Sequence, residues 1–235
     1  MLHAYAILWI NYCFILEDYV VIIKEFCAEN FTNIPNAIAS GANRIELCDN
    51  LAVGGTTVSK GVMTETIAYC SEKNIPVFPI IRPRGGNFIY TDTEIKIMEA
   101  DIYEAKQLGA DGVVIGCLNE NNWIDEEAME ILLDAASGMQ VTFHMAFDVM
   151  SRDNQFQAID WLAERSVDRI LTHGGMSGTP IEQNLEYISD LMSYANNRIT
   201  LLPGGNVSYK NIDAVTSFLQ VKEVHGTKIV DFPFK

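Results

Sequence analysis

The chain has 235 residues, of which 49% are hydrophobic and 20% are charged, so it can bury one large core or two small ones. Its 16 basic and 31 acidic residues give a formal net charge of −15, which argues against nucleic acid and anionic membrane surfaces as partners. Five cysteines, none in a C-x-x-C pair, favour reduced thiols in a cytoplasmic protein over a disulfide framework or a structural zinc site.

Residues 1–19 form an apolar extension without a lysine or arginine. The extension lacks the positive start and the small-residue cleavage site of a secretory signal. It is also too short to cross a membrane, and His3 and Asn11 interrupt it. We expect a helix here, because residues 2–16 suffice for about four helical turns, roughly 22 Å. A leader without a structural role is the alternative reading.

From residue 20 onwards, short apolar runs rich in β-branched residues alternate with helical patterns. The runs begin near Val20, Arg44, Val77, Gly112, Val141, Arg169, Ile199 and Val221. The clearest helix is expected over residues 91–109, with Thr91 or Asp92 as its N-cap and Gly109 as its C-terminal stop. Another helix is expected to open at Thr179 and Pro180.

Strands and helices that alternate at this spacing predict a parallel sheet, and eight strands predict that the sheet closes. We therefore expect a single α/β domain, a (β/α)8 barrel over residues 20–235. Only ten residues follow His225, so a full-length eighth helix does not fit after the last strand. The apolar extension could cover the groove between the last strand and the first, or it could contact a second copy of the chain.

The first two strands carry an unusual set of residues on one face. Alternation in "RIELCDN" puts Arg44, Glu46 and Cys48 on one side of the second strand. In the first strand, "KEFCAEN" does the same with Glu25, Cys27 and Glu29. In a barrel one strand face contacts the helices and the other faces the interior, where function gathers at the C-terminal strand ends. These residues are therefore candidates for a site.

Polar residues at the other strand ends would meet at the same mouth. Arginine pairs with anions, and histidine or glutamate can move a proton, so this set is typical of a site for a small polar molecule. The catalytic candidates are Glu46, Arg82, His144 and Asp148. The candidates for binding an anion or phosphate are Arg84, Gly204, Gly205, His225 and Gly226. Structural alternatives remain open: a buried Glu46–Arg82 ion pair, and His144 as a hydrogen-bonded core histidine.

The blocks "FCAEN", "RIELCDNLAVGGTT", "IRPRGGNF", "LGADGVVIG", "VTFHMAFD", "RILTHGG", "LPGGN" and "VHGT" resemble, in this order and spacing, the CutC family of copper homeostasis proteins. The resemblance runs from about Lys24 to Lys228 and implies a cytoplasmic (β/α)8 barrel linked to copper. It implies that Cys27 and Cys48 correspond to the two cysteines proposed as copper ligands. The chain departs from the family pattern at Met145, where Arg is frequent, at His173 and at Asn206.

The chemistry of copper is compatible with that cysteine pair. Cu(I) favours thiolates at low coordination number, and neighbouring strands lie about 4.8 Å apart. The alternative is that Cys27 and Cys48 fill the interior as small apolar side chains, as we expect of Cys70 and Cys117.

Two functions therefore stand. The first is copper homeostasis, with copper bound as Cu(I) at Cys27 and Cys48. The second is an enzyme that acts by acid/base chemistry on a small phosphorylated or carboxylated metabolite. A homo-oligomer is compatible with either.

Overall fold

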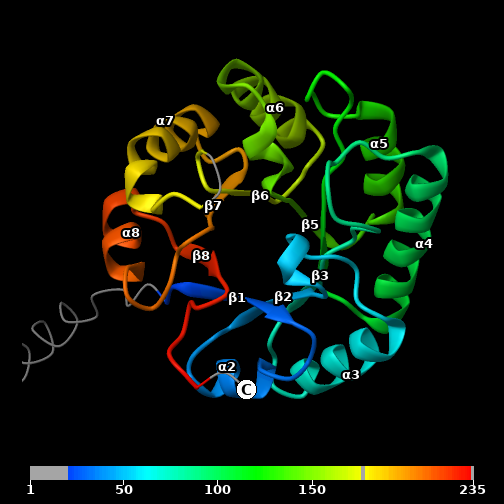
Figure 1. Cartoon of the computed structure of the whole chain (residues 1–235), viewed down its shortest axis with the longest axis vertical. Coiled ribbons are helices and arrows are strands. Elements are labelled where there is room, and N and C mark those ends of the chain that lie inside the picture. The colour runs from blue at the N-terminus through cyan, green and yellow to red at the C-terminus, as the bar shows by residue number, and fades with distance from the viewer. Residues whose placement is uncertain (1–20, 176–177, 234–235) are drawn as a thin grey trace, which may run out of the picture.

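The computed structural model describes residues 21–175 and 178–233, and these form a ring of parallel strands enclosed by helices (Figure 1). The strands are β1 (Ile23–Glu29), β2 (Arg44–Cys48), β3 (Val77–Pro79), β4 (Gly112–Ile115), β5 (Gln140–Phe143), β6 (Arg169–Thr172), β7 (Thr200–Pro203) and β8 (Glu223–Gly226). The predicted (β/α)8 barrel is confirmed.

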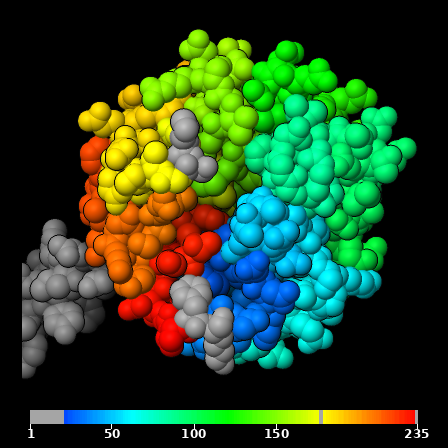
Figure 2. All heavy atoms as spheres, viewed as in Figure 1, coloured from blue at the N-terminus to red at the C-terminus, as the bar shows by residue number. Residues whose placement is uncertain are grey.

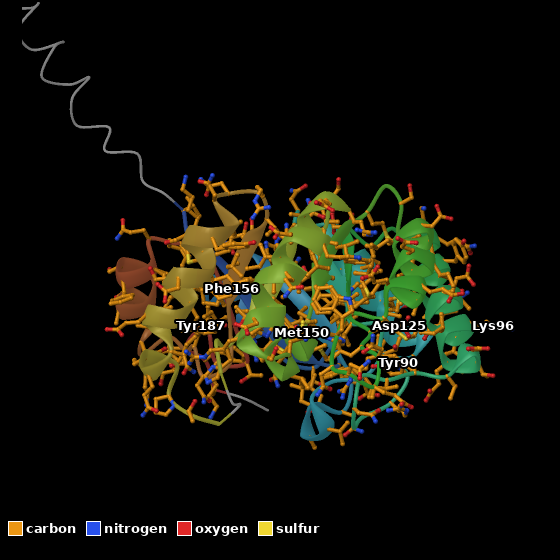
Figure 3. The ribbon with its side chains drawn as sticks, turned by 90° about the horizontal axis from the view of Figure 1, so that it is seen from above. Tyr90, Lys96, Asp125, Met150, Phe156 and Tyr187 are labelled. Carbon is orange, nitrogen blue, oxygen red and sulfur yellow. The ribbon has the colours of Figure 1, made fainter. Side chains whose placement is uncertain are left out.

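Seven α-helices surround the strands: α2 (Ile34–Ala39), α3 (Lys60–Ser71), α4 (Asp92–Leu108), α5 (Glu126–Ala135), α6 (Arg152–Glu164), α7 (Leu185–Ala195) and α8 (Ile212–Leu219), counted over the described residues. Three 3-10 helices lie in loops: η1 (Leu51–Val53), η2 (Met145–Val149) and η3 (Ile181–Gln183). Adjacent helices contact each other through aromatic rings. Phe156 of α6 meets Tyr187 of α7 edge-on, with ring centroids 6.3 Å apart (Figure 3).

The best-defined helix begins and ends as its sequence predicts. Thr91 accepts a hydrogen bond from the backbone N–H of Glu94, and the Glu94 carboxylate accepts one from the backbone N–H of Thr91, which completes a capping box. Gly109 ends the helix at a φ of +87°, a conformation that a side chain disfavours. The helix predicted at Pro180 begins instead as η3, and α7 follows from Leu185.

The sheet closes by two different connections. Hydrogen-bonded ladders run in the orders β3-β2-β1-β8 and β4-β5-β6-β7. The backbone N–H of Ile81 donates to the carbonyl of Val114 at 2.8 Å, which joins β3 to β4. On the other side a parallel bridge between Ser208 and Lys228, just beyond the strands, joins the segments that follow β7 and β8.

The two faces of the strands contact different surroundings. Ile45, Leu47, Phe143 and their outward-facing counterparts pack against the helices in one large core, which also contains Cys70 and Cys117 as predicted. A small separate cluster fills part of the barrel interior with Cys27, Cys48, Phe78, Ile80 and Val114.

The floor of the barrel, at the N-terminal ends of the strands, is ionic. Glu223 accepts hydrogen bonds from Arg44 at 2.7 Å and from Arg169 at 3.0 Å, and Arg44 also pairs with Glu25. Both guanidinium groups lie over the Phe78 ring, at 5.5 and 5.1 Å from its centroid. Arg44, Arg169 and Glu25 are buried and Glu223 is partly buried. Together they fill the lower half of the barrel and leave the upper half for a site.

The first and last strands lie close to their predicted positions. The first and last strands begin at Ile23 and Glu223, a little later than predicted, because the β1–β8 ladder starts with that pair. No helix follows β8 within residues 227–233. The helix predicted in the extension lies outside the described residues. None of the helices described here is both long and apolar enough to span a membrane.

Candidate functional site

A cavity of about 270 Å³ opens at the C-terminal ends of the strands. On this face the segments that follow β1 and β2, blue and cyan, meet the red C-terminal segment (Figure 2). Eight of the residues predicted for the site line the cavity: Cys27, Glu46, Cys48, Arg82, His144, Gly205, His225 and Gly226. The mouth of the barrel is therefore hollow where the predicted polar residues converge.

The two cysteines lie diagonally across the first two strands. In the β1–β2 register Cys27 is opposite Glu46 and Glu29 is opposite Cys48, so both thiols point into the barrel. Their Sγ atoms are 4.0 Å apart, and the Cys48 thiol donates to Glu46 Oε2 at 3.5 Å. One ligand atom from each of Cys27, Glu46 and Cys48 lies within 4.8 Å of the other two. These three buried groups could hold a metal ion.

Both thiols are held in the protonated form. The contact with Cys48 and burial raise the pKa of Cys27 well above its ordinary value. The Cys27 contact would lower the pKa of Cys48, but burial and the Glu46 carboxylate outweigh it and raise that pKa to about 12. A metal that binds here as a thiolate complex must therefore displace protons.

His225 connects two buried carboxylates. Its Nδ1 donates to Glu25 at 2.8 Å, and its Nε2 lies 3.6 Å from Glu46 Oε2. Burial opposes protonation of the ring, but Glu46, Cys27 and Glu25 raise the pKa of His225 well above its ordinary value. Burial alone would raise the pKa of Glu25, whereas Arg44 and His225 lower it to about 2. His225 is thus a buried cation beside the cysteine pair.

Arg82 is bound to loops rather than to a carboxylate. Its Nη1 donates to the carbonyls of Val53 and Gly55 at 2.9 and 2.8 Å, and its Nη2 donates to the carbonyl of Gly86 at 2.9 Å. Among the described residues no ion pair joins it to Glu46. The alternative of a Glu46–Arg82 ion pair is therefore wrong, because Glu46 faces His225.

His144 is neutral. Its Nδ1 accepts a hydrogen bond from the backbone N–H of Ala146 at 3.2 Å, which leaves the proton on Nε2. Burial and then the charge of Arg82 lower the pKa of His144 to about 3. Its ring lies against Phe88, with centroids 4.8 Å apart. His144 is therefore a hydrogen-bond donor at the cavity near pH 7.

Two predicted residues support loops outside the cavity. Asp148 accepts hydrogen bonds from the Thr172 hydroxyl at 2.5 Å and from the backbone N–H of His173 at 2.8 Å. Arg84 donates to Glu94 at 2.5 Å and to several carbonyls of its own loop. Neither lines the cavity, so their positions favour structural roles over the predicted catalytic and anion-binding ones.

The predicted glycines leave space for different neighbouring atoms. A Cβ on Gly226 would lie 2.2 Å from the Val207 carbonyl oxygen, and one on Gly204 would lie 2.5 Å from the Leu171 side chain. Gly205 has a φ of +74° and lines the cavity, whereas Gly204 does not. Of the three predicted glycines, Gly205 and Gly226 therefore line the cavity, as does Gly54, which was not predicted.

The three positions that depart from the family pattern lie at the cavity or just behind it. Met145 and Asn206 line the cavity. His173 lies behind it, with Nδ1 within 2.9 Å of the Gly205 carbonyl oxygen. Phe88, which contacts both Arg82 and His144, is a cavity residue that sequence reasoning missed. It lies in a loop, where no periodic pattern indicates which way a side chain points.

Comparison with known proteins identifies the family. A sequence model of the CutC family matches residues 22–230. The chain belongs to the CutC family. A CutC family protein from Enterococcus faecalis is 64% identical over 208 residues, which cover 88% of this chain and 100% of that protein. A human relative named copper homeostasis protein cutC homolog is 38% identical over 203 residues, covering 86% of this chain and 72% of the relative.

A solved CutC structure has the same fold. The crystal structure of CutC from Streptococcus agalactiae superposes with a TM-score of 0.87 at 48% sequence identity, covering 89% of this chain and 100% of that one. The CutC barrel thus extends over nearly all of the described residues.

Proposed function

We propose that this protein serves copper homeostasis in the cytoplasm by binding Cu(I) through the Sγ atoms of Cys27 and Cys48. The observation that carries the proposal is the buried cluster of two thiols and one carboxylate within 4.8 Å. Cu(I) is soft and is satisfied by few thiolate ligands, so a buried pair is enough. The copper homeostasis name of the human relative supports the same reading.

The charges around the pair suit a bound Cu(I). Two thiolates and one Cu(I) carry a net negative charge, which Glu46 alone would repel. His225, 3.6 Å from Glu46, supplies a buried positive charge, and Arg82 supplies another at the same cavity. Because two protonated thiols must lose their protons, Cu(I) affinity should rise with pH across the neutral range.

The test is a Cu(I) titration of the reduced protein against a competing chelator. The parent should bind close to one Cu(I) per chain, and Cys27→Ser or Cys48→Ser should abolish this binding. Cys70→Ser is the matched control, because Cys70 is equally buried but lies in the helix-facing core. A Cys27→Ser/Cys48→Ser double variant that still binds Cu(I) like the parent would show the proposal to be wrong.

A further inference from the structure

The cavity contains hydrogen-bond donors that a copper site does not use. Cys27, Cys48 and Glu46 supply the metal ligands, yet Arg82 and His144 line the same cavity. Arg82 Nε and His144 Nε2 are buried and form no well-aligned hydrogen bond among the described residues, although the Tyr90 hydroxyl lies beside Arg82. Leaving a buried donor unpaired is energetically unfavourable. Such donors are normally bonded when buried, so two at one cavity indicate a ligand.

Arg82 offers the first donor. Its three hydrogen bonds to loop carbonyls fix the guanidinium but engage only three of its five N–H groups. The Nε–H is among those left over, and the residue is only 3% exposed. No ion pair neutralises Arg82 within residues 21–175 and 178–233, so it also offers an uncompensated positive charge.

His144 offers the second donor, beside the first. Since Nδ1 accepts from Ala146, the proton is on Nε2, and that atom has no described partner. Both side chains lie against one ring: the Arg82 guanidinium carbon is 5.0 Å and the His144 ring centroid 4.8 Å from the centroid of Phe88. The two side chains therefore share one neighbour, Phe88, in the lining of the cavity.

The rest of the lining determines the kind of ligand. Apolar side chains complete the wall, namely Leu51, Ile80, Phe88, Met145 and Leu171. The cavity, at about 270 Å³, is smaller than a site for a drug-sized molecule. Glu46 also lines it, and its carboxylate would repel a phosphate dianion more than a monoanion.

We propose that this cavity binds a small monocarboxylate with a short hydrocarbon chain. Its carboxylate oxygens accept hydrogen bonds from Arg82 Nε and His144 Nε2, and its chain contacts the apolar wall. This site goes beyond the copper site and does not depend on it, since neither donor is a copper ligand.

The test uses the full-length, reduced, metal-free protein with acetate, propionate and butyrate as probes, against sodium chloride at equal ionic strength. Each acid should shift the 15N signal of His144 Nε2 to saturation and raise the melting temperature. Affinity should increase about fourfold for each added methylene, because each one leaves water for the apolar wall. His144→Phe keeps a ring against Phe88 but removes the donor, and it should weaken butyrate binding roughly tenfold.

Arg198→Met is the control, because it also removes a guanidinium, but from an exposed ion pair with Asp160 that does not line the cavity. It should retain the parent affinity for butyrate. The proposal is overturned if none of the three acids saturates, if phosphate binds more tightly than butyrate, or if His144→Phe and Arg198→Met titrate alike. The Cu(I) titration is a separate readout: a protein that binds Cu(I) but no carboxylate contradicts this inference alone, and the reverse contradicts the metal site alone.

Discussion

At His144, burial and a neighbouring guanidinium act on the same ring. The side chain is 4% exposed, and Gly116 approaches so closely that a Cβ there would lie 2.5 Å from the His144 ring. Burial disfavours the charged ring, and Arg82 disfavours it further, so the pKa falls from 6.5 to about 3. The residue remains a neutral donor, which fits ligand binding better than proton transfer near pH 7.

This depressed pKa predicts how stability depends on pH. Between about pH 6.5 and pH 3 the unfolded chain binds a proton at His144 that the folded protein does not, so stability falls as the pH is lowered through this window. At pH 5 the loss relative to pH 7.5 should be about 2 kcal/mol from this residue. Urea titrations at both pH values measure the free energy of unfolding. Its difference between pH 7.5 and pH 5 should be about 2 kcal/mol smaller in His144→Phe than in the parent. An unchanged pH dependence in that variant would contradict a buried, neutral His144.

At the scale of the elements, glycines at the strands set how closely side chains approach inside the barrel. On β4, a Cβ at Gly112 would lie 2.2 Å from the Phe78 ring, and just after β4 Gly116 leaves space for His144. Both glycines were visible in the sequence as part of an apolar run. Their reason lies in the rings of Phe78 and His144, which belong to the neighbouring strand β3 and to the residue after the neighbouring strand β5.

Gly116→Ala should therefore displace His144 and destabilise the protein by about 1–3 kcal/mol, because the added methyl group has no free space. Chemical denaturation measures this directly. Gly61→Ala is the control: Gly61 lies in α3 with nothing within 4 Å of its Cβ position, so alanine should change stability by less than about 1 kcal/mol, towards greater stability. Equal effects of the two substitutions would rule out the steric explanation.

For the molecule as a whole, the ionic floor closes one end of the barrel. Glu223 is shared by Arg44 and Arg169, which belong to β2 and β6, so a single carboxylate connects three strands. Glu25 links the same floor to His225 and hence to the cavity above it. Buried charges of this kind are strongly destabilising when one partner is removed.

Glu223→Gln should therefore cost about 3 kcal/mol of unfolding free energy, since among the described residues it leaves Arg169 without a carboxylate partner and Arg44 with Glu25 alone. Glu130→Gln is the matched control, because Glu130 forms an exposed ion pair with Arg165. That change should cost less than about 1 kcal/mol. Urea titrations of both variants distinguish the two cases, and a cost below 1 kcal/mol for Glu223→Gln would show that the floor is not a major stabilising element.

The sequence by itself determined the barrel and the meeting of Cys27 with Cys48. Alternation within a strand and helical periodicity are local properties, so they indicate which residues face inward, and the alternating order of strands and helices indicates which strands are neighbours. The capping of α4 between Thr91 and Gly109 was predictable for the same reason.

Only the tertiary structure decided what the inward residues contact. Arg82 donates to Val53, Gly55 and Gly86, in loops whose paths depend on contacts with the rest of the barrel. Asp148 and Arg84 support loops outside the cavity, although both follow strand ends as the site residues do. His225 meets Glu25 across 200 positions of chain. Alternation gives the direction of a side chain from its own strand, but its partners come from long-range packing, which no local pattern encodes.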